Sequence, residues 1–166
     1  MTDFIKEYHS LKQKKNDIFF MNKAVDNADN SDGGPFGAVI VKNNEIISNG
    51  NNKVTIENDP SAHAEIVAIR NACKKLNTFN LDGCVIYTSC EPCPMCLSAC
   101  YWTRLNKIYY SNTRVDAANI GFSDEFIYDE LNKTDDKKTL PIVKIDNKNA
   151  IKTFERWNNN VNKVEY

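Results

Sequence analysis

The pattern of hydrophobic and polar positions predicts a helix followed by a hairpin at the start of the chain. Between residues 17 and 29, apolar side chains recur at positions 18, 21, 25 and 28, which is helical spacing. Residues 31–35 combine serine, aspartate, glycine and proline, so they form a loop by their turn chemistry. Two apolar runs at residues 36–41 and 45–48 flank Asn43-Asn44, and we expect them to form two strands joined by a tight turn.

The middle of the chain predicts helices that alternate with strands. Asp59-Pro60 is a typical helix start, because the aspartate caps the helix and the proline fits its first turn. This helix should run to about Leu76. The residues expected on its buried side are Ile66, Ile69, Ala72 and Cys73.

The remaining elements complete a predicted sheet. Strands are expected at residues 84–88, 107–111 and 141–145, and Pro92 and Pro94 suit the start of a helix that continues to Trp102. Residues 133–138 predict a solvated loop. The chain therefore predicts an α/β fold with a mixed β-sheet of about five strands, covered by helices on both faces.

The length of 166 residues is sufficient for one domain with a core of its own, and no internal repeat or linker divides the chain. We therefore expect a single domain over residues 1–166. Residues 1–15 mix charged and polar side chains and do not resemble a secretion signal. The longest early apolar run, residues 18–21, is too short to span a membrane.

The composition excludes some classes of function. Lys and Arg number 21 against 22 Asp and Glu, a balance that argues against a dedicated nucleic-acid binder. Six cysteines without a secretion signal indicate a reducing, cytoplasmic setting rather than a disulfide scaffold. Two of the six stand at metal-binding spacing. The other four, expected to be free thiols, are Cys73, Cys84, Cys90 and Cys100.

The candidate chemistry lies in His63-Ala64-Glu65 and in the later segment Pro92-Cys93-Pro94-Met95-Cys96. His63, Cys93 and Cys96 offer three soft metal ligands, whereas a structural zinc site normally has four protein ligands. A three-ligand site leaves room for a water, and zinc lowers the pKa of such a water to about 7. With Glu65 available to move protons, the pattern predicts a hydrolytic zinc enzyme.

The spacing of the ligands predicts where the metal lies. In a helical first turn, Cys93 and Cys96 share one face, and His63 should also lie in the first turn of its helix. Both helix dipoles then favour thiolates. Positions 63 and 65 point to nearly opposite sides of a helix, so Glu65 reaches the metal only if the ion lies beyond the helix end. The alternative is a closed structural site with Cys90 as fourth ligand, which would have no use for Glu65.

The H-x-E and P-C-x-x-C pattern is a known signature of zinc deaminases, and with it the chain resembles the cytidine deaminase-like superfamily. Within this superfamily it is similar to the bacterial guanine deaminases. The resemblance extends from Gly33 to the end of the chain, and residues 1–15 look like an N-terminal extension. The segments that carry the resemblance are residues 33–41, 51–52, 58–60, 88–96, 101–102, 116–118, 121–124, 126–128 and 163–166.

The resemblance implies a set of site residues. His63, Cys93 and Cys96 match ligands of one Zn²⁺ per subunit with a bound water, and Glu65 matches the proton-shuttling carboxylate. Asn52 matches a side chain that hydrogen-bonds a purine, and Phe36 matches a ring that stacks on it. Asp124 matches a carboxylate near the leaving amine, and Tyr166 matches a tyrosine that closes the pocket.

Each of the last four residues has a structural alternative. Asn52 could cap the end of a strand, Phe36 could belong to the core, and Asp124 could cap a helix over residues 125–131. Tyr166 lies at the end of the chain, where residues are commonly poorly ordered.

The resemblance also implies a homodimer in which about residues 146–166 are exchanged, so that Tyr166 could serve the neighbouring subunit. The implied reaction is hydrolysis of guanine to xanthine and ammonia, with a small purine base as partner and without membrane or nucleic-acid partners. Three alternatives stay open. They are a tRNA adenosine deaminase, a nucleoside or cytosine deaminase, and a non-catalytic zinc module.

Overall fold

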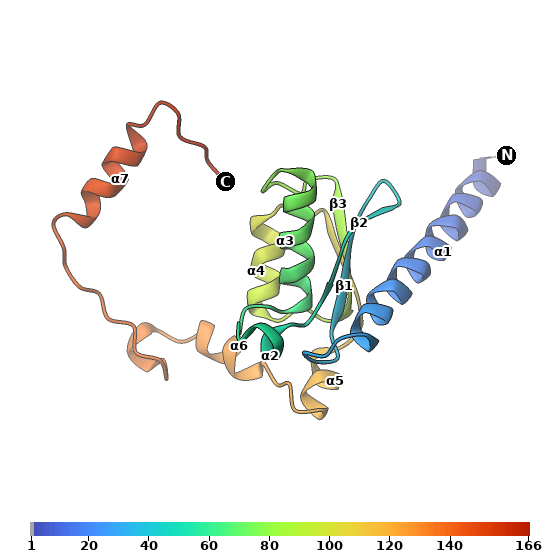
Figure 1. The fold of residues 1–166 in the computed structure, drawn as a ribbon, viewed down its shortest axis with the longest axis horizontal. Helices are drawn as coiled ribbons and strands as arrows, with labels where there is room; N and C mark the ends of the chain where they lie inside the picture. The colour runs from blue at the N-terminus through green and yellow to red at the C-terminus, as the bar shows by residue number, and fades with distance from the viewer. Residues whose placement is uncertain (1) are drawn as a thin grey trace. The chain divides into compact units, whose positions relative to one another are not determined.

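A four-stranded β-sheet forms the centre of the N-terminal part of the chain (Figure 1). Its strands lie in the order β2-β1-β3-β4. β1 pairs antiparallel with β2 and β3, and β3 pairs parallel with β4, so the sheet is mixed as predicted. The strand bounds are β1 Gly37–Lys42, β2 Glu45–Asn51, β3 Cys84–Cys90 and β4 Lys107–Asn112.

The structure is a computed structural model that describes residues 2–166, with side chains described from residue 6 onward. The chain divides into two compact units, the first ending at Asp124 and the second comprising Glu125–Tyr166. The sheet belongs entirely to the first unit. Each unit is described below by itself.

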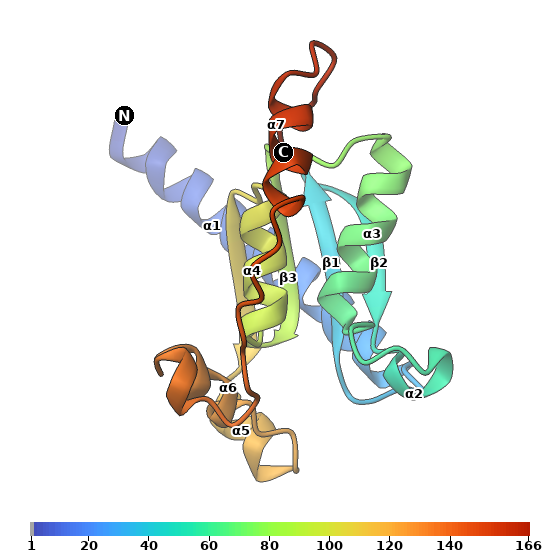
Figure 2. The same cartoon turned by 90° about the vertical axis from the view of Figure 1, so that its left-hand side faces the viewer.

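Helices cover both faces of the sheet, in agreement with the prediction (Figure 2). The long helix α1 (Thr2–Asp29) lies on one face. On the other face lie α3 (Ala64–Leu76) and α4 (Pro94–Trp102). Two short helices, α2 (Val54–Glu57) and α5 (Arg114–Asn119), lie in the connections.

The alternation of side chains along β1 produces a core on each face of the sheet. Ala38 and Ile40 face α3, whereas Val39 and Val41 face α1, and all four are buried. Because successive side chains of a strand point to opposite faces, a strand covered on both sides is apolar at every position. This is why residues 36–41 form a continuous apolar run rather than an alternating one.

Two contacts set the helices close to the sheet. At Gly50 in β2, a Cβ atom would collide with the Ala64 carbonyl oxygen and the Ala68 nitrogen, so only glycine lets the backbone of α3 approach this closely. On the opposite face, the Tyr87 hydroxyl donates a hydrogen bond of 2.6 Å to Asp17 Oδ1 of α1. The contact at Gly50 therefore places the start of α3 against β2, and the bond from Tyr87 holds α1 against the other face.

Two helix boundaries differ from the prediction. α1 begins at Thr2 rather than at residue 17, and it includes the predicted extension. The helix expected from Asp59-Pro60 begins instead at Ala64. Asp59 does act as a local cap, but it accepts hydrogen bonds from the backbone and hydroxyl of Ser61 within a turn.

The prediction of a fifth strand at residues 141–145 was wrong, and the sheet has four strands. These residues lie in the second unit, which contains no strand. An isolated strand has no partner for its backbone groups, and Pro141 also lacks an N–H donor. An apolar run with suitable residues is therefore not sufficient to form a strand.

The second unit consists of short helices connected by extended chain. They are α6 (Glu125–Leu131), the 3₁₀ turn η1 (Asp135–Lys137) and α7 (Ala150–Asn158). The predicted loop at residues 133–138 is largely exposed and contains η1. Glu130 organises this region because its carboxylate accepts hydrogen bonds from the backbone and hydroxyl of Thr139 and pairs with Lys133 at 2.6 Å. No residue of the second unit is buried within the chain.

Among residues 2–166, no helix is both long and apolar enough to cross a membrane. All six cysteines are free thiols.

We predict that Gly50→Ala destabilises the protein by about 3 kcal/mol, because overpacking a backbone contact forces β2 and α3 apart. The contrasting variant is Gly121→Ala, where φ is +94° but no atom lies within 4 Å of the added Cβ. Its cost should be about 1 kcal/mol, from backbone conformation alone. Urea unfolding of both variants measures the difference, and equal losses would contradict the steric explanation.

Candidate active site

The N-terminal ends of α3 and α4 hold the three predicted metal ligands. His63 is the N-cap of α3 (φ −66°, ψ 155°), and Cys93 is the N-cap of α4 (φ −63°, ψ 168°). Both residues therefore precede the helix in extended conformation, rather than lying in its first turn as predicted. This conformation frees His63 from the helical projection that would direct it away from Glu65.

The three ligand atoms converge at distances that suit zinc. His63 Nδ1 lies 3.6 Å from the Sγ atoms of both Cys93 and Cys96. All three ligand atoms lie within 4.8 Å of one another. Tetrahedral zinc, with Zn–S near 2.3 Å and Zn–N near 2.0–2.1 Å, places a nitrogen and a sulfur ligand about 3.6 Å apart. The donor set and its spacing therefore fit a zinc ion.

The electrostatics of the two cysteines also suit a metal. The thiol of Cys96 and the ring of His63 both hydrogen-bond the Cys93 sulfur, and they lower the pKa of Cys93 to about 4. The pKa of Cys96 is raised by the same pairing with Cys93 and by burial. Cys93 thus faces the ligand position as a thiolate, and Cys96 faces it with its thiol proton in place. A bound cation would release that proton, because the thiolate is the metal ligand.

Glu65 lies beside this group, in the first turn of α3, and is buried. Its Oε2 accepts a hydrogen bond of 3.5 Å from the Cys96 thiol. Burial raises the pKa of the Glu65 carboxyl above its ordinary value, because desolvation disfavours the charged form. A raised pKa is the direction of shift that favours a carboxyl's use as both acceptor and donor of a proton.

Cys90 does not join the metal group, which contains only His63, Cys93 and Cys96 among residues 2–166. The Cys90 thiol points elsewhere, toward the Thr113 carbonyl oxygen at 3.6 Å. Burial, followed by the charge of Glu65, raises the pKa of Cys90 to about 11. The geometry therefore disfavours the closed four-ligand alternative.

Asn52 is buried directly after β2, and its side chain has a fixed orientation. Its Oδ1 accepts a hydrogen bond of 3.0 Å from the Val54 backbone N–H. With the amide oxygen engaged in this way, the Nδ2 amide remains as the end that can hydrogen-bond a ligand. Asn52 is thus prepared to donate, although the same contact also caps the turn before α2.

Phe36 lies directly before β1 and has the core role that the sequence offered as one alternative, whereas its stacking on a purine stays a prediction. It packs against the core between the sheet and α3, and its ring meets Phe122 edge to face at 5.0 Å and 89°. The Ser89 hydroxyl accepts a hydrogen bond of 3.1 Å from the Gly37 N–H, which holds the start of β1 next to the end of β3. Sequence analysis missed Phe122 as a partner of Phe36.

Asp124 ends the first unit and interacts electrostatically with Cys93. Burial raises the pKa of the Asp124 carboxyl, and the charge of Cys93 raises it further, while Arg114 acts in the opposite direction. Arg114 is also a residue that sequence analysis missed, because a single arginine at the start of a short helix has no distinguishing pattern. Its backbone N–H donates to Glu91 Oε2 at 3.1 Å. Tyr166 belongs to the second unit, so its relation to the metal group stays a prediction.

Comparison with known proteins identifies the family of this site. Residues 14–112 match the family model described as the cytidine and deoxycytidylate deaminase zinc-binding region. The matched segment is more than half of the chain and contains the three converging ligands. The chain belongs to this deaminase family.

A relative and a solved structure of this family are similar to the chain over most of its length. A guanine deaminase from Bacillus subtilis (strain 168) is 52% identical over 134 residues, which are 81% of this chain and 86% of that protein. A solved structure of a B. subtilis guanine deaminase has a TM-score of 0.87 at 48% identity, covering 89% of this chain and 97% of that one.

Two further relatives are similar over a smaller extent. The solved structure of a guanine deaminase from Nitrosomonas europaea has a TM-score of 0.59 at 31% identity and covers 63% of each chain. A tRNA-specific adenosine deaminase from Aquifex aeolicus (strain VF5) is 49% identical over 77 residues, 46% of this chain and 51% of that protein.

We predict that Cys96→Ala loses bound zinc whereas Cys90→Ala retains it, because only the first residue contributes a converging ligand atom. Both changes remove one buried thiol, so each serves as the stability control for the other. The measurement is the zinc content of the purified variants by atomic absorption. Loss of zinc from Cys90→Ala would instead favour the closed four-ligand site.

Proposed function

We propose that this protein is a zinc-dependent guanine deaminase, which hydrolyses guanine to xanthine and ammonia. The observation that carries the proposal is the extent of similarity to the B. subtilis guanine deaminase, 52% identity over 134 residues. The metal motif is shared by deaminases of different substrates and cannot discriminate between them. Similarity to the A. aeolicus tRNA adenosine deaminase, by contrast, covers 46% of this chain.

The proposed cofactor is one Zn²⁺ per subunit, held by His63, Cys93 and Cys96, with a water in the fourth position. This is supported by the 3.6 Å spacing of the nitrogen and sulfur atoms. When bound, zinc lowers the pKa of its water to about 7 and so provides hydroxide at neutral pH. The helix N-termini of α3 and α4 add a favourable field for thiolates and hydroxide.

Glu65 is proposed as the proton carrier of the reaction. It takes a proton from the attacking water and delivers it to a ring nitrogen of guanine, which makes the amine-bearing C2 electrophilic. The raised pKa of its buried carboxyl supports this role, because a proton carrier works best when its pKa lies near the operating pH. The departing amine takes a further proton, for which Glu65 and Asp124 are the candidates.

Four side chains are proposed to recognise the base. Asn52 donates through Nδ2 to an acceptor of the purine, as the bond from Val54 N–H to its Oδ1 requires. Phe36 stacks on the ring, supported from the side by Phe122. Asp124 accepts from the base edge near the leaving amine, and Tyr166 closes the pocket.

We propose that the protein is a homodimer in which about residues 146–166 are exchanged between subunits, with the whole chain serving as one deaminase domain. The apolar face of α7 supports this, because Ile151, Phe154 and Trp157 follow one another at helical spacing and are all exposed. An unburied stripe of this kind marks an interaction surface.

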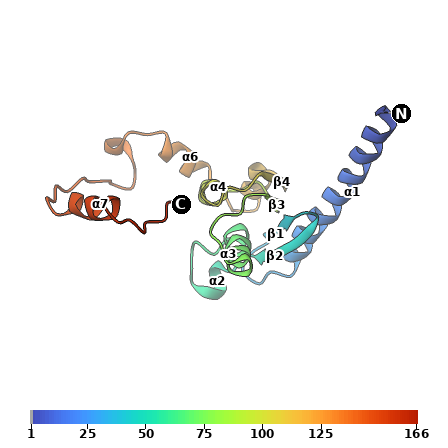
Figure 3. The same cartoon turned by 90° about the horizontal axis from the view of Figure 1, so that it is seen from above.

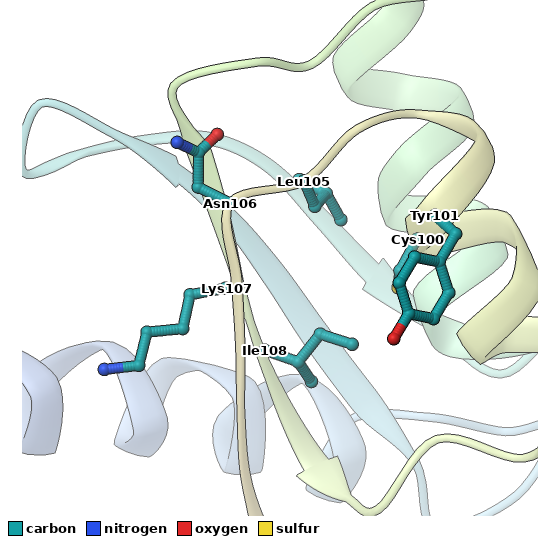
Figure 4. Close-up of a pocket in the computed structure, with 6 residues that line it drawn as sticks. All are labelled: Cys100, Tyr101, Leu105, Asn106, Lys107 and Ile108. Atoms are coloured by element: carbon teal, nitrogen blue, oxygen red, sulfur yellow. The ribbon is translucent and has the colours of Figure 1, made fainter.

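The first unit also has exposed apolar surface that a second copy could cover. A cavity of about 220 Å³ opens beside the edge strand β4, where Leu105 and Ile108 face Tyr101 of α4 (Figure 4). Tyr101 and Trp102 of α4 are also exposed.

Six free thiols support a reducing, cytoplasmic setting for the protein.

We predict that the protein releases ammonia from free guanine, as measured on a panel that also contains guanosine, adenine, cytosine and an adenosine-containing RNA hairpin. Activity on the RNA without activity on guanine would overturn the substrate assignment and favour a tRNA deaminase. Zinc retention without activity on any base would favour a non-catalytic zinc module.

The matched control for this panel is Glu65→Gln, which removes the proton carrier but no metal ligand. It should retain zinc and lose turnover by at least about 100-fold, the usual contribution of a positioned acid–base group. Wild-type rates in this variant would contradict the mechanism while leaving the substrate assignment intact.

We further predict that the mutants Glu65→Gln and Tyr166→Ala complement each other when unfolded and refolded together with zinc. If Tyr166 serves the neighbouring subunit, a mixed dimer contains one site with both an intact Glu65 and an intact Tyr166. Guanine turnover in the mixture should then exceed that of either variant alone. If the mixed dimers form and gain no activity, Tyr166 acts in its own subunit or has no role in the site.

A further inference from the structure

The side of α1 that faces away from the sheet carries an exposed apolar stripe. Phe20 and Ala24, on the sheet side of the helix, are buried. Leu11, Ile18 and Val25 lie on nearly the opposite side and are 56%, 55% and 36% exposed. The core of the protein therefore uses one face of α1 and leaves a second apolar face uncovered within the chain.

The spacing of this stripe is typical of helix pairing. Leu11, Ile18 and Val25 are seven residues apart, the repeat that keeps a seam facing a partner helix in a coiled coil. Tyr8, also exposed, precedes Leu11 by three residues and fits the second position of the repeat. The stripe from Tyr8 to Val25 spans about 26 Å of helix. Figure 3 shows that the N-terminal half of α1 extends beyond the sheet.

The charges of α1 determine the direction in which two copies would fit. Residues 2–15 contain four lysines and two acidic residues, whereas residues 16–29 contain one lysine and three acidic residues. Antiparallel pairing places the basic half of each helix against the acidic half of the other, whereas parallel pairing places like charges together. Charge complementarity of this kind selects partner and orientation.

We propose that α1 pairs antiparallel with α1 of a second copy of this chain. The register that aligns the two stripes places Tyr8 opposite Val25 of the second copy, and Lys15 opposite Ile18. Polar residues such as Lys15 within a seam restrict the register at some cost in stability. An anionic lipid surface is the other partner that an exposed amphipathic helix commonly binds. The acidic second half of α1 disfavours it, because acidic residues repel anionic lipid.

This pairing is independent of the proposed segment exchange. The metal group is carried by α3 and α4, on the face of the sheet opposite to α1 (Figure 2). A seam along α1 thus does not use the face that carries the metal group, and two such seams would join two exchanged dimers into a closed tetramer. If the exchange does not occur, the same seam joins two monomers.

The first test compares Leu11→Lys with Ser10→Lys by sedimentation equilibrium at matched concentration. Both variants add one lysine to an exposed position of the same helical turn, but only the first places it in the stripe. We expect the mass of Leu11→Lys to be half that of the wild type, and Ser10→Lys to keep the wild-type mass. Equal masses for all three proteins would overturn the proposal.

The second test fixes the orientation by disulfide trapping under mild oxidation. A chain with Tyr8→Cys mixed with a chain with Val25→Cys should form a cross-linked dimer, at a yield several-fold above either chain alone and above the wild type. Stronger cross-linking in the unmixed variants would show parallel pairing and contradict the inference. Wild-type binding to phosphatidylserine vesicles that Leu11→Lys abolishes, with no change in mass, would assign the stripe to a lipid surface instead.

Discussion

Everything in this site depends on the meeting of two helix N-termini around three soft ligand atoms. His63 and Cys93 each cap a helix with extended backbone, and Cys96 reaches the same point from the first turn of α4. The spacing of 3.6 Å from His63 Nδ1 to each sulfur suits tetrahedral zinc. It is maintained from outside the site by the close contact of α3 with β2 at Gly50. A shift of either helix by an ångström would open the ligand set.

The same arrangement concentrates groups that repel one another when they are ionised. Cys93, Cys96 and the buried Glu65 lie together. Hydrogen bonds from Cys96 and His63 lower the pKa of Cys93, the pairing with Cys93 raises the pKa of Cys96, and burial raises the pKa of Glu65. A divalent cation held by His63, Cys93 and Cys96 would relieve this repulsion, because it would replace protons on the thiols. Glu65 is not one of the converging ligands, so its carboxyl would remain available for proton transfer with a cation bound. The destabilising placement of a buried carboxylate is thus what makes the site suitable for acid–base chemistry.

The comparison of prediction with structure shows where local rules are sufficient. Strands β1 to β4 could be predicted because apolar runs bounded by turn residues are local features. The helix expected at Asp59-Pro60 begins at Ala64, because Ser61 competes for the Asp59 side chain within a turn. The strand expected at residues 141–145 fails because pairing requires a neighbour that lies outside any local pattern. The contact of Phe122 with Phe36 and the position of Arg114 near Asp124 could not be predicted, since they depend on which segments lie side by side.

The sequence by itself determined the identity of the metal ligands, the presence of a non-ligand carboxylate and the alternation of elements, because these depend on residue type and short spacing. Only the tertiary structure decided that Cys90 points away from the metal group and that Asn52 presents its amide nitrogen. It also decided that His63 and Glu65 can act together, through the extended conformation of an N-cap residue. The direction of Cys90 is set by a segment far along the chain, whereas the directions of Asn52 and His63 depend on the backbone conformation beside a helix, which residue type and spacing do not specify.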